Sequence, residues 1–212
     1  MSLAYNPYGL QPILNQSGII RQAPTPGVIA SGYAVNLFQY TPVQIDSTTP
    51  TGNLVIAPAM GAGSATPTVA NRLIGSFEGV EFTLTATGRR TVSNMWPANT
   101  VATNIVAWYT RDPYLTYQIQ ANGPVNQLNL GYQASITTNG TANGNTTTGF
   151  STVGLDVTTA NSLVGPGTQP TFFNQLRIVG FSQAIDNNVG DAFTVVQVQI
   201  SLHQDVANQL PY

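Results

Sequence analysis

The chain has 212 residues and a formal net charge of −2, and only 7% of its residues are charged, where about a quarter is usual. It lacks cysteine, which excludes disulfides and thiolate metal sites, and its pI near 5.0 argues against nucleic-acid binding. Lysine is also absent, so all six basic residues are arginines, the cation that protein interfaces favour. We interpret this composition as a surface largely covered by neighbouring protein. The alternative is a polar extracellular β-domain that amides and hydroxyls keep soluble.

Residues 1–27 are predicted to form an extended N-terminal arm. Four prolines interrupt this segment and remove backbone donors, so it should not form an internal strand. It nevertheless carries many large apolar side chains, unlike a solvated tail. The arm either crosses onto another protein or folds back on its own domain, and both alternatives stay open. The interface residues predicted in the arm and in the tail at 205–212 are Tyr5, Tyr8, Leu10, Ile13, Leu14, Ile19, Ile20, Arg21, Leu210 and Tyr212.

From residue 28 onward, β-forming runs alternate with turns and loops. Two runs in the first half, 73–77 and 80–84, flank a predicted turn at Glu78–Gly79. Tracts of small and polar residues at 58–70 and 138–149 are expected to be loops, the second an exposed loop tip. The other expected strand regions in this part of the chain are 28–45, 54–57, 91–95, 101–109 and 115–120.

Two strands are expected near the C-terminus, at 176–181 and 193–200. The second carries apolar residues on both faces, which predicts a central strand covered on both sides. No apolar stripe with helical spacing extends over eleven residues, and turn signals recur about every ten residues, as in sandwiches and barrels. We therefore predict an all-β fold: a single β-sandwich, jelly-roll-like or barrel domain over 28–204, flanked by the arm (1–27) and a C-terminal tail (205–212).

Groups that could perform catalysis are few and scattered. His203 is the only histidine, and its place after the last strand favours a packing or interface role over a catalytic triad. The eight carboxylates are dispersed, and the segment 186–191, which could offer oxygen ligands to Ca²⁺, is better explained as an Asx turn. We therefore expect no enzymatic activity, no cofactor and no metal site.

No membrane or secretion signal is expected. The chain contains no run of 18 apolar residues, and residues 1–7 lack the charged and apolar regions of a signal peptide. We predict that the protein contacts neither membrane nor nucleic acid.

A series of short motifs resembles a known protein family. The similarity covers roughly residues 28–204, and the order of the motifs carries it, because no single motif is diagnostic. The matching segments are Ile29–Leu37, Ile74–Phe82, Ser93–Ala98, Asp112–Pro113, Gln175–Gly180, Gly190–Phe193 and Leu202–Gln204. In this order they resemble small virion proteins of tailed bacteriophages, which are capsid decoration or cement proteins. The arm and the tail after Gln204 match less clearly.

The resemblance implies a structural virion protein on the outer surface of the capsid. Its partners would be the major capsid protein and further copies of itself as a homotrimer, and no catalytic residue is carried over. A trimer would suit three-fold lattice positions, but the choice between three-fold and two-fold positions stays open. If the arm forms interfaces, deleting residues 1–20 should leave the domain folded but weaken these contacts. A receptor- or carbohydrate-binding module of a tail or fibre is the main alternative, and it predicts clustered, exposed Trp or Tyr with Asp or Asn on loops. The loop at 138–149 has Asn and Thr but no aromatic residue before Phe150. A virion-associated hydrolase is a third possibility that the residues disfavour.

Overall fold

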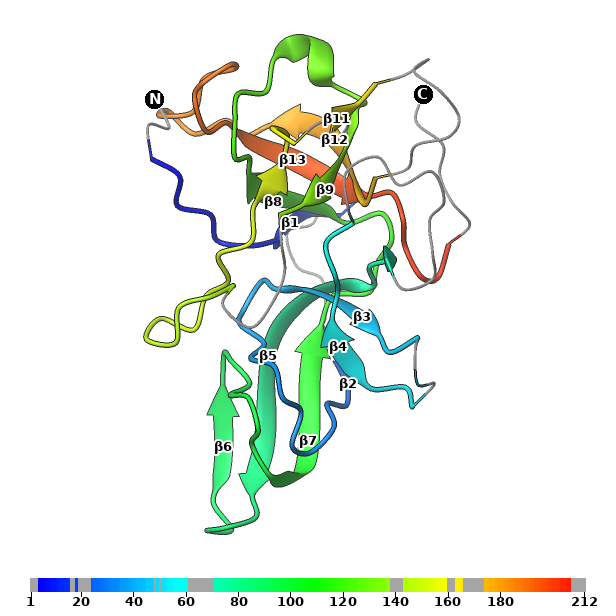
Figure 1. Cartoon of the computed structure of the whole chain (residues 1–212), viewed down its shortest axis with the longest axis vertical. Coiled ribbons are helices and arrows are strands. Elements are labelled where there is room, and N and C mark those ends of the chain that lie inside the picture. The colour runs from blue at the N-terminus through cyan, green and yellow to red at the C-terminus, as the bar shows by residue number, and fades with distance from the viewer. Residues whose placement is uncertain are drawn as a thin grey trace.

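The computed structural model describes residues 4–15, 18, 24–47, 49, 51–60, 71–137, 143–159, 163–165 and 174–206. The fold is all-β, as predicted, and consists of two antiparallel sheets of seven and six strands, neither of which closes on itself. Figure 1 shows the seven-stranded sheet in the upper part of the molecule and the six-stranded sheet below it. The described residues contain no α-helix, only a 3₁₀ turn, η2 (Gln127–Asn129). This architecture is consistent with a β-sandwich rather than a barrel.

The seven-stranded sheet combines the N-terminal segment with the second half of the chain. A single bridge joins Ala121 to Leu155, but no ladder closes the sheet there. In spatial order its strands are β1 (Gln11–Leu14), β8 (Thr116–Gln120), β13 (Val195–Ile200), β12 (Leu176–Phe181), β9 (Gln133–Ile136) and β10 (Leu155–Asp156), with β11 (Leu163–Val164) also paired to β9.

The six-stranded sheet is formed by residues 25–109. Its longest strands, β5 and β7, pair along most of their length at its centre. In spatial order its strands are β2 (Thr25–Gly27), β7 (Ala102–Tyr109), β5 (Gly75–Leu84), β3 (Pro42–Ile45) and β4 (Leu54–Ile56), with β6 (Arg90–Ser93) also paired to β5.

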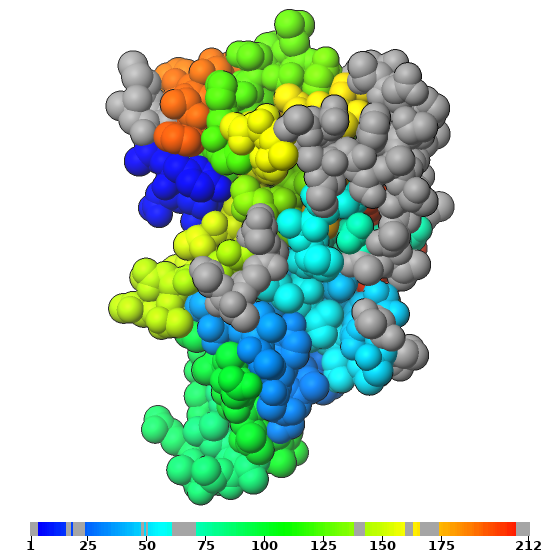
Figure 2. All heavy atoms as spheres, in the orientation of Figure 1, coloured from blue at the N-terminus to red at the C-terminus, as the bar shows by residue number. Residues whose placement is uncertain are grey.

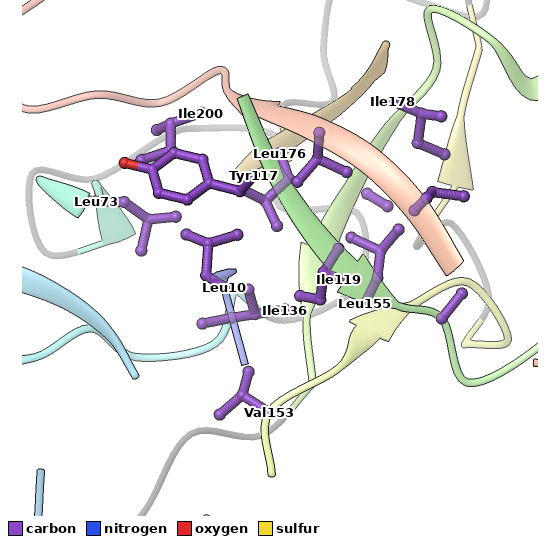
Figure 3. Packing of buried hydrophobic residues seen from close by; sticks show 14 of the residues in the cluster. Leu10, Leu73, Tyr117, Ile119, Ile136, Val153, Leu155, Leu176, Ile178 and Ile200 are labelled. Atoms are coloured by element: carbon purple, nitrogen blue, oxygen red, sulfur yellow. The ribbon is translucent and has the colours of Figure 1, made fainter. Parts of the chain in front are cut away.

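Each sheet has its own cluster of buried apolar side chains. The cluster of the seven-stranded sheet includes Tyr117 and aliphatic residues of β8, β12 and β13, and Figure 3 shows it from close by. The cluster of the six-stranded sheet includes Phe77, Phe82 and the fully buried Trp96, whose ring meets Phe82 edge-on at 5.3 Å between centroids. The burial of Trp96 agrees with the core role that such a large side chain usually has.

Uncharged amide side chains join the two halves of the molecule. The Gln175 amide donates to the carbonyls of Pro58 and Asn71 at 2.8 and 2.9 Å. The Gln204 side chain makes two hydrogen bonds with the backbone of Ile45, accepting from its N–H at 2.7 Å and donating to its carbonyl at 2.9 Å. Buried backbone groups need such partners, and here amides supply them in a chain that has few charges.

The N-terminal segment takes part in both sheets, which corrects the expectation that residues 1–27 stand apart from them. β1 pairs with β8, and β2 pairs with β7, each at the edge of its sheet. Both strands contain a proline, Pro12 and Pro26, and an edge position tolerates proline because one side of the strand needs no ladder hydrogen bond. The predicted exclusion of this segment from internal strands therefore agrees with the structure, but its exclusion from the sheets does not.

Leu10, which was predicted to lie at an interface, is instead buried in the core. It is 0% exposed and belongs to the cluster of the seven-stranded sheet, where Figure 3 shows it among the other buried side chains. Its N–H donates to the carbonyl of Tyr40 at 2.8 Å, and the N–H of Gly9 donates to Val153 at 3.0 Å. Among the described residues, the arm thus folds back on its own domain. The expectation that deleting residues 1–20 spares the fold stays a prediction, and the burial of Leu10 and the pairing of β1 argue against it.

The predicted turn at Glu78–Gly79 is a β-bulge inside one continuous strand. Along the β5–β7 ladder, Phe77 pairs with Tyr109 and Gly79 pairs with Trp108, which leaves Glu78 as the extra residue. Glycine favours this geometry, since a Cβ at Gly79 would lie only 3.1 Å from the carbonyl oxygen of Ser93. The run 80–84 and the residues 75–77 are strand, as predicted, but the strand begins at Gly75 rather than at 73, and the residues between the two runs do not reverse the chain.

β13 is central in its sheet, as predicted, but only one of its faces is fully buried. Val196, Val198 and Ile200 are buried, whereas the intervening Val195, Gln197 and Gln199 are half-buried. The strand at 176–181 has the predicted bounds. Among the described residues, the structure contains no helix with the length and hydrophobicity that crossing a membrane requires.

Candidate functional site

His203 is buried at the junction of the two sheets, where it forms a bridge with Leu73. Its Nδ1 accepts the backbone N–H of Asp205 at 3.1 Å. In a catalytic triad this nitrogen instead donates to a carboxylate. Burial lowers the pKa of His203 below its ordinary value of 6.5, and the negative charge of Asp205 opposes this only in part. The imidazole is therefore neutral in the folded protein and serves packing at the junction.

Replacing His203 with asparagine is expected to remove an acid-dependent loss of stability. Because the folded state favours the neutral ring, the unfolded chain takes up a proton first as the pH falls below about 6.5, and this favours unfolding. Asparagine keeps an oxygen acceptor for the Asp205 N–H but does not titrate. Urea unfolding at pH 5 and 7 should show that the stability difference between wild type and His203→Asn shrinks at the lower pH. An unchanged difference would contradict the assignment.

Glu78 is the most strongly perturbed carboxyl among the described residues. Burial in the bulge of β5 raises its pKa to about 7, although a hydrogen bond with the Gln39 side chain opposes the shift. Its Oε1 is buried without a hydrogen-bond partner. Its charge also raises the pKa of the Tyr40 hydroxyl, after the larger effect of burial on that ring. Glu78 is thus a titratable group inside the domain that sequence inspection had assigned to a turn.

The other carboxylates occupy structural positions that are separate from one another. Glu81 pairs with Arg90, and Asp205 pairs with Arg111 at 2.8 Å. Asp156 accepts hydrogen bonds from the Asn122 amide and from its own loop. Among the described residues, no group of three or more acidic or histidine side chains could hold a metal ion.

The segment 186–191, considered above for Ca²⁺, is held by local hydrogen bonds. Asp191 Oδ2 accepts the N–H of Asn188 at 2.9 Å. The Asn187 side chain bonds the backbone of Ser182 and Val195. These are the contacts of an Asx-type loop, as the sequence favoured.

The structure separates the predicted interface residues into buried and exposed groups. Leu10 is in the core, Tyr8 and Ile13 are half-buried, and Tyr5 and Leu14 are each 40% exposed. The Tyr5 ring rests on Phe193, with centroids 5.5 Å apart. The remaining predictions, Ile19, Ile20, Arg21, Leu210 and Tyr212, lie outside the described residues. Of the predicted interface residues that the structure describes, Tyr5 and Leu14 are therefore the exposed ones.

A different exposed apolar surface lies on two adjacent loops at one end of the molecule. The distal loop surface consists of Leu128, which is 85% exposed, the fully exposed Ile185, and Val189. The N–H of Gly190 donates to the carbonyl of Val125 at 2.9 Å and so joins the two loops. Figure 1 shows both loops, in green and orange, at the top of the seven-stranded sheet. Sequence inspection missed this surface because its residues belong to loops 55 or more positions apart.

A pocket of about 350 Å³ lies where the N-terminal segment meets the loop at 143–152. Figure 2 shows this loop, in yellow-green, projecting beside the blue N-terminal segment. We call this cavity the arm–loop pocket. It is lined by Asn6, Pro7, Tyr8, Asn145, Thr148, Phe150, Ser151 and Thr152.

Backbone hydrogen bonds hold the walls of the arm–loop pocket in place. Gln39 donates to the carbonyl of Gly149 at 2.8 Å and accepts from Ser151 at 2.9 Å. Two glycines allow the close packing, since a Cβ at Gly144 would lie 2.0 Å from the Phe38 ring and one at Gly9 would lie 2.3 Å from the carbonyl oxygen of Tyr40. The pocket is therefore lined by two segments that are distant in the sequence, 6–8 and 145–152, and residues 38–40 support its walls.

An aromatic pair lies beside the arm–loop pocket. Tyr40 stacks on Phe150 with ring centroids 5.9 Å apart and an interplanar angle of 29°. Tyr40 has a φ of 67°, a left-handed conformation that is costly for a bulky residue. Its N–H donates to the carbonyl of Phe77 at 2.7 Å, and its carbonyl accepts from Leu10, so the backbone is held in this state from both sides. Strain of this kind often accompanies ligand-binding sites.

Comparisons with protein-family models, with curated proteins and with solved structures find no match to this chain.

Proposed function

We propose that this chain is a structural virion protein that binds the outer surface of a phage major-capsid lattice and stabilises the head. The ordered motifs between residues 28 and 204 support this proposal through their resemblance to decoration proteins. The domain presents exposed apolar surface in a chain with few charges, and its sheets are joined by amide hydrogen bonds. Such a protein needs a rigid framework and wide contacts rather than reactive groups.

The distal loop surface is the observation that carries the proposal. Large exposed apolar side chains on adjoining loops of a soluble protein can mark a contact with another macromolecule. Leu128 and Ile185 are almost entirely exposed and belong to loops that a backbone hydrogen bond joins. We assign contact with the capsid lattice to this end of the domain. We also propose that the protein associates with itself as a trimer on the capsid.

Placing a charge on the distal loop surface is expected to weaken binding to the capsid without unfolding the protein. The double variant Leu128→Asp/Ile185→Asp would bury two charges at the interface, and each lost apolar contact there contributes about 1.5–3 kcal/mol. Co-sedimentation with phage heads prepared without the protein should therefore show at least a tenfold loss of affinity.

Val92→Asp is the control, because Val92 is also an exposed aliphatic residue but lies on β6 of the other sheet. It should bind like wild type. Equal binding by all three proteins, with unchanged melting temperatures, would rule out the distal loop surface as the capsid contact.

The purified protein is expected to self-associate, and a trimer is the form that suits three-fold positions. Multi-angle light scattering at high micromolar concentration measures this directly. Gel densitometry of purified virions should show hundreds of copies per particle, which separates a decoration protein from a fibre present in tens or fewer. A monomer in solution together with a low copy number would contradict the proposal.

A receptor- or carbohydrate-binding module is the second candidate function, and the arm–loop pocket favours it. That alternative predicts exposed Trp or Tyr beside Asp or Asn on loops, and here a phenylalanine supplies the exposed aromatic ring. Phe150 is 41% exposed and lines the pocket together with Asn6 and Asn145. The residues meet only in the folded chain, since Asn6 and Asn145 are far apart in the sequence.

A further inference from the structure

We propose that the arm–loop pocket binds one ring of a neutral oligosaccharide, stacked against Phe150. This proposal is independent of capsid decoration, because the pocket and the distal loop surface share no residue. The ligand class follows from the lining residues, the hydrogen-bonding groups they leave unused and the rigidity of the walls.

The lining of the pocket carries no charged side chain. Its eight residues supply one phenyl ring, one phenol, one proline, two amides and three hydroxyls. Amides and hydroxyls donate and accept hydrogen bonds in the same way that sugar hydroxyls do. An anionic ligand would lack a cation to pair with, and a cation would lack a carboxylate. A neutral, polyhydroxylated ligand therefore matches the lining best.

Phe150 is positioned as a platform rather than as a core residue. One side of its ring stacks on Tyr40, and its exposed part borders the pocket. Isolated exposed phenylalanines are unremarkable, but this ring is backed by a strained tyrosine and fixed by backbone hydrogen bonds on both sides. The apolar face of a sugar ring can cover such a platform and remove its remaining apolar surface from water.

The side-chain amide of Asn145 has a hydrogen-bonded oxygen and a nitrogen that makes no hydrogen bond with another described residue. Its Oδ1 accepts the N–H groups of Thr147 and Thr148 at 2.8 and 3.3 Å, which fixes the orientation of the amide. Its Nδ2 makes no hydrogen bond with another described residue, and Asn145 is one of the residues that line the pocket. A preoriented donor of this kind binds a ligand hydroxyl at low entropic cost.

Asn6 and Thr152 add further groups with unused capacity. The backbone N–H of Asn6 donates to Gln120 Oε1 at 2.8 Å, and that of Thr152 donates to the carbonyl of Asn143 at 3.0 Å. These bonds fix both backbones, whereas the two side chains make no hydrogen bond with any other described residue. The pocket's volume of about 350 Å³ is at the small end of ligand pockets, which span about 300–1,000 Å³, so one ring or a disaccharide fits.

The test is saturation-transfer NMR of the full chain with methyl glycosides of glucose, galactose, mannose and N-acetylglucosamine. At least one of them is expected to bind with a dissociation constant on the order of 1 mM, as suits a small open pocket. Glucuronic acid and glucosamine serve as anionic and cationic probes and should bind at least tenfold more weakly. Absence of binding by all four neutral probes at tens of millimolar would overturn the proposal, as would equal binding of a charged probe.

Variants of the pocket then locate the binding. Phe150→Ala should weaken the best neutral glycoside at least tenfold, and Phe150→Tyr should retain it. Thr152→Val keeps the shape of the side chain but removes its hydroxyl, so it should cost about threefold to tenfold. Tyr114→Ala removes an exposed aromatic that does not line the pocket and should bind like wild type.

Thermal melting shows whether each variant is folded. If Phe150→Ala does not fold, the affinity of Thr152→Val decides whether the sugar binds in the arm–loop pocket. Binding that persists unchanged in both pocket variants would place the sugar elsewhere and overturn the assignment. Because the distal loop surface is separate, these variants should bind phage heads like wild type, so failure of this proposal is distinguishable from failure of the decoration role.

Discussion

Leu10→Ala is expected to destabilise the protein by about 2–5 kcal/mol, the cost of truncating a buried leucine in a packed core. Leu10 is 0% exposed and contributes to the cluster that includes β8, β12 and β13. The backbone around it is held by the hydrogen bonds to Tyr40 and Val153, so the chain cannot easily collapse into the space that alanine would leave. The measurement is urea unfolding at pH 7, followed by far-UV circular dichroism.

Leu14→Ala is the matched control, since Leu14 is the same residue type in the same segment but is 40% exposed. It should change the free energy of unfolding by less than about 1 kcal/mol. Deleting residues 1–15 should be at least as damaging as Leu10→Ala, because it also removes β1 from the edge of β8. If both leucines tolerate alanine equally well, the N-terminal segment is not part of the core and the arm interpretation returns.

Glu78→Gln is expected to stabilise the protein at alkaline pH, by up to roughly 3 kcal/mol. The folded state raises the pKa of Glu78 from 4.5 to about 7, chiefly through burial. Between these two values the folded protein holds a proton that the unfolded chain has already released. Stability due to this group is therefore complete below about pH 4.5, falls as the pH rises, and stays low above about 7. Glutamine remains neutral and can keep a hydrogen bond with Gln39.

The experiment compares melting temperatures and urea midpoints of wild type and Glu78→Gln at pH 4.5 and 8.5. The variant should gain at pH 8.5 and differ little at pH 4.5. Glu81→Gln is the matched control on the same strand, because Glu81 is paired with the exposed Arg90 and should change stability by about 1 kcal/mol or less. A gain from Glu78→Gln that is independent of pH would mean that packing, not ionisation, is responsible.

The two proposals concern two surfaces of different chemistry on one small domain. The distal loop surface is apolar and suits contact with a protein lattice, whereas the arm–loop pocket is polar, aromatic and suits a soluble sugar. They share no residue, so a single copy could bind the capsid and a sugar at the same time. A decoration protein that also held a sugar would bring the particle to glycan-bearing surfaces, and the variants above test each role separately.

The sequence by itself determined the fold class and many of the strands. A two-residue period, frequent turn signals and the lack of a helical stripe are local properties, so they predict an all-β chain without knowledge of its partners. The strand at 176–181 shows this well, because its predicted and observed bounds coincide. Composition also determined that no thiol chemistry is possible, since cysteine is absent.

Only the tertiary structure decided where the arm lies, what Glu78 does and which residues form a pocket. Each depends on residues that are distant in the chain. Leu10 bonds the carbonyl of Tyr40, the bulge at Glu78 forms in the ladder between β5 and β7, and Asn6 and Asn145 line the same pocket. A bulge shifts the pairing by one residue, which no local pattern of polar and apolar residues specifies. Proline likewise forbids a central strand but not an edge strand, and only the completed sheet determines which strands are at its edges.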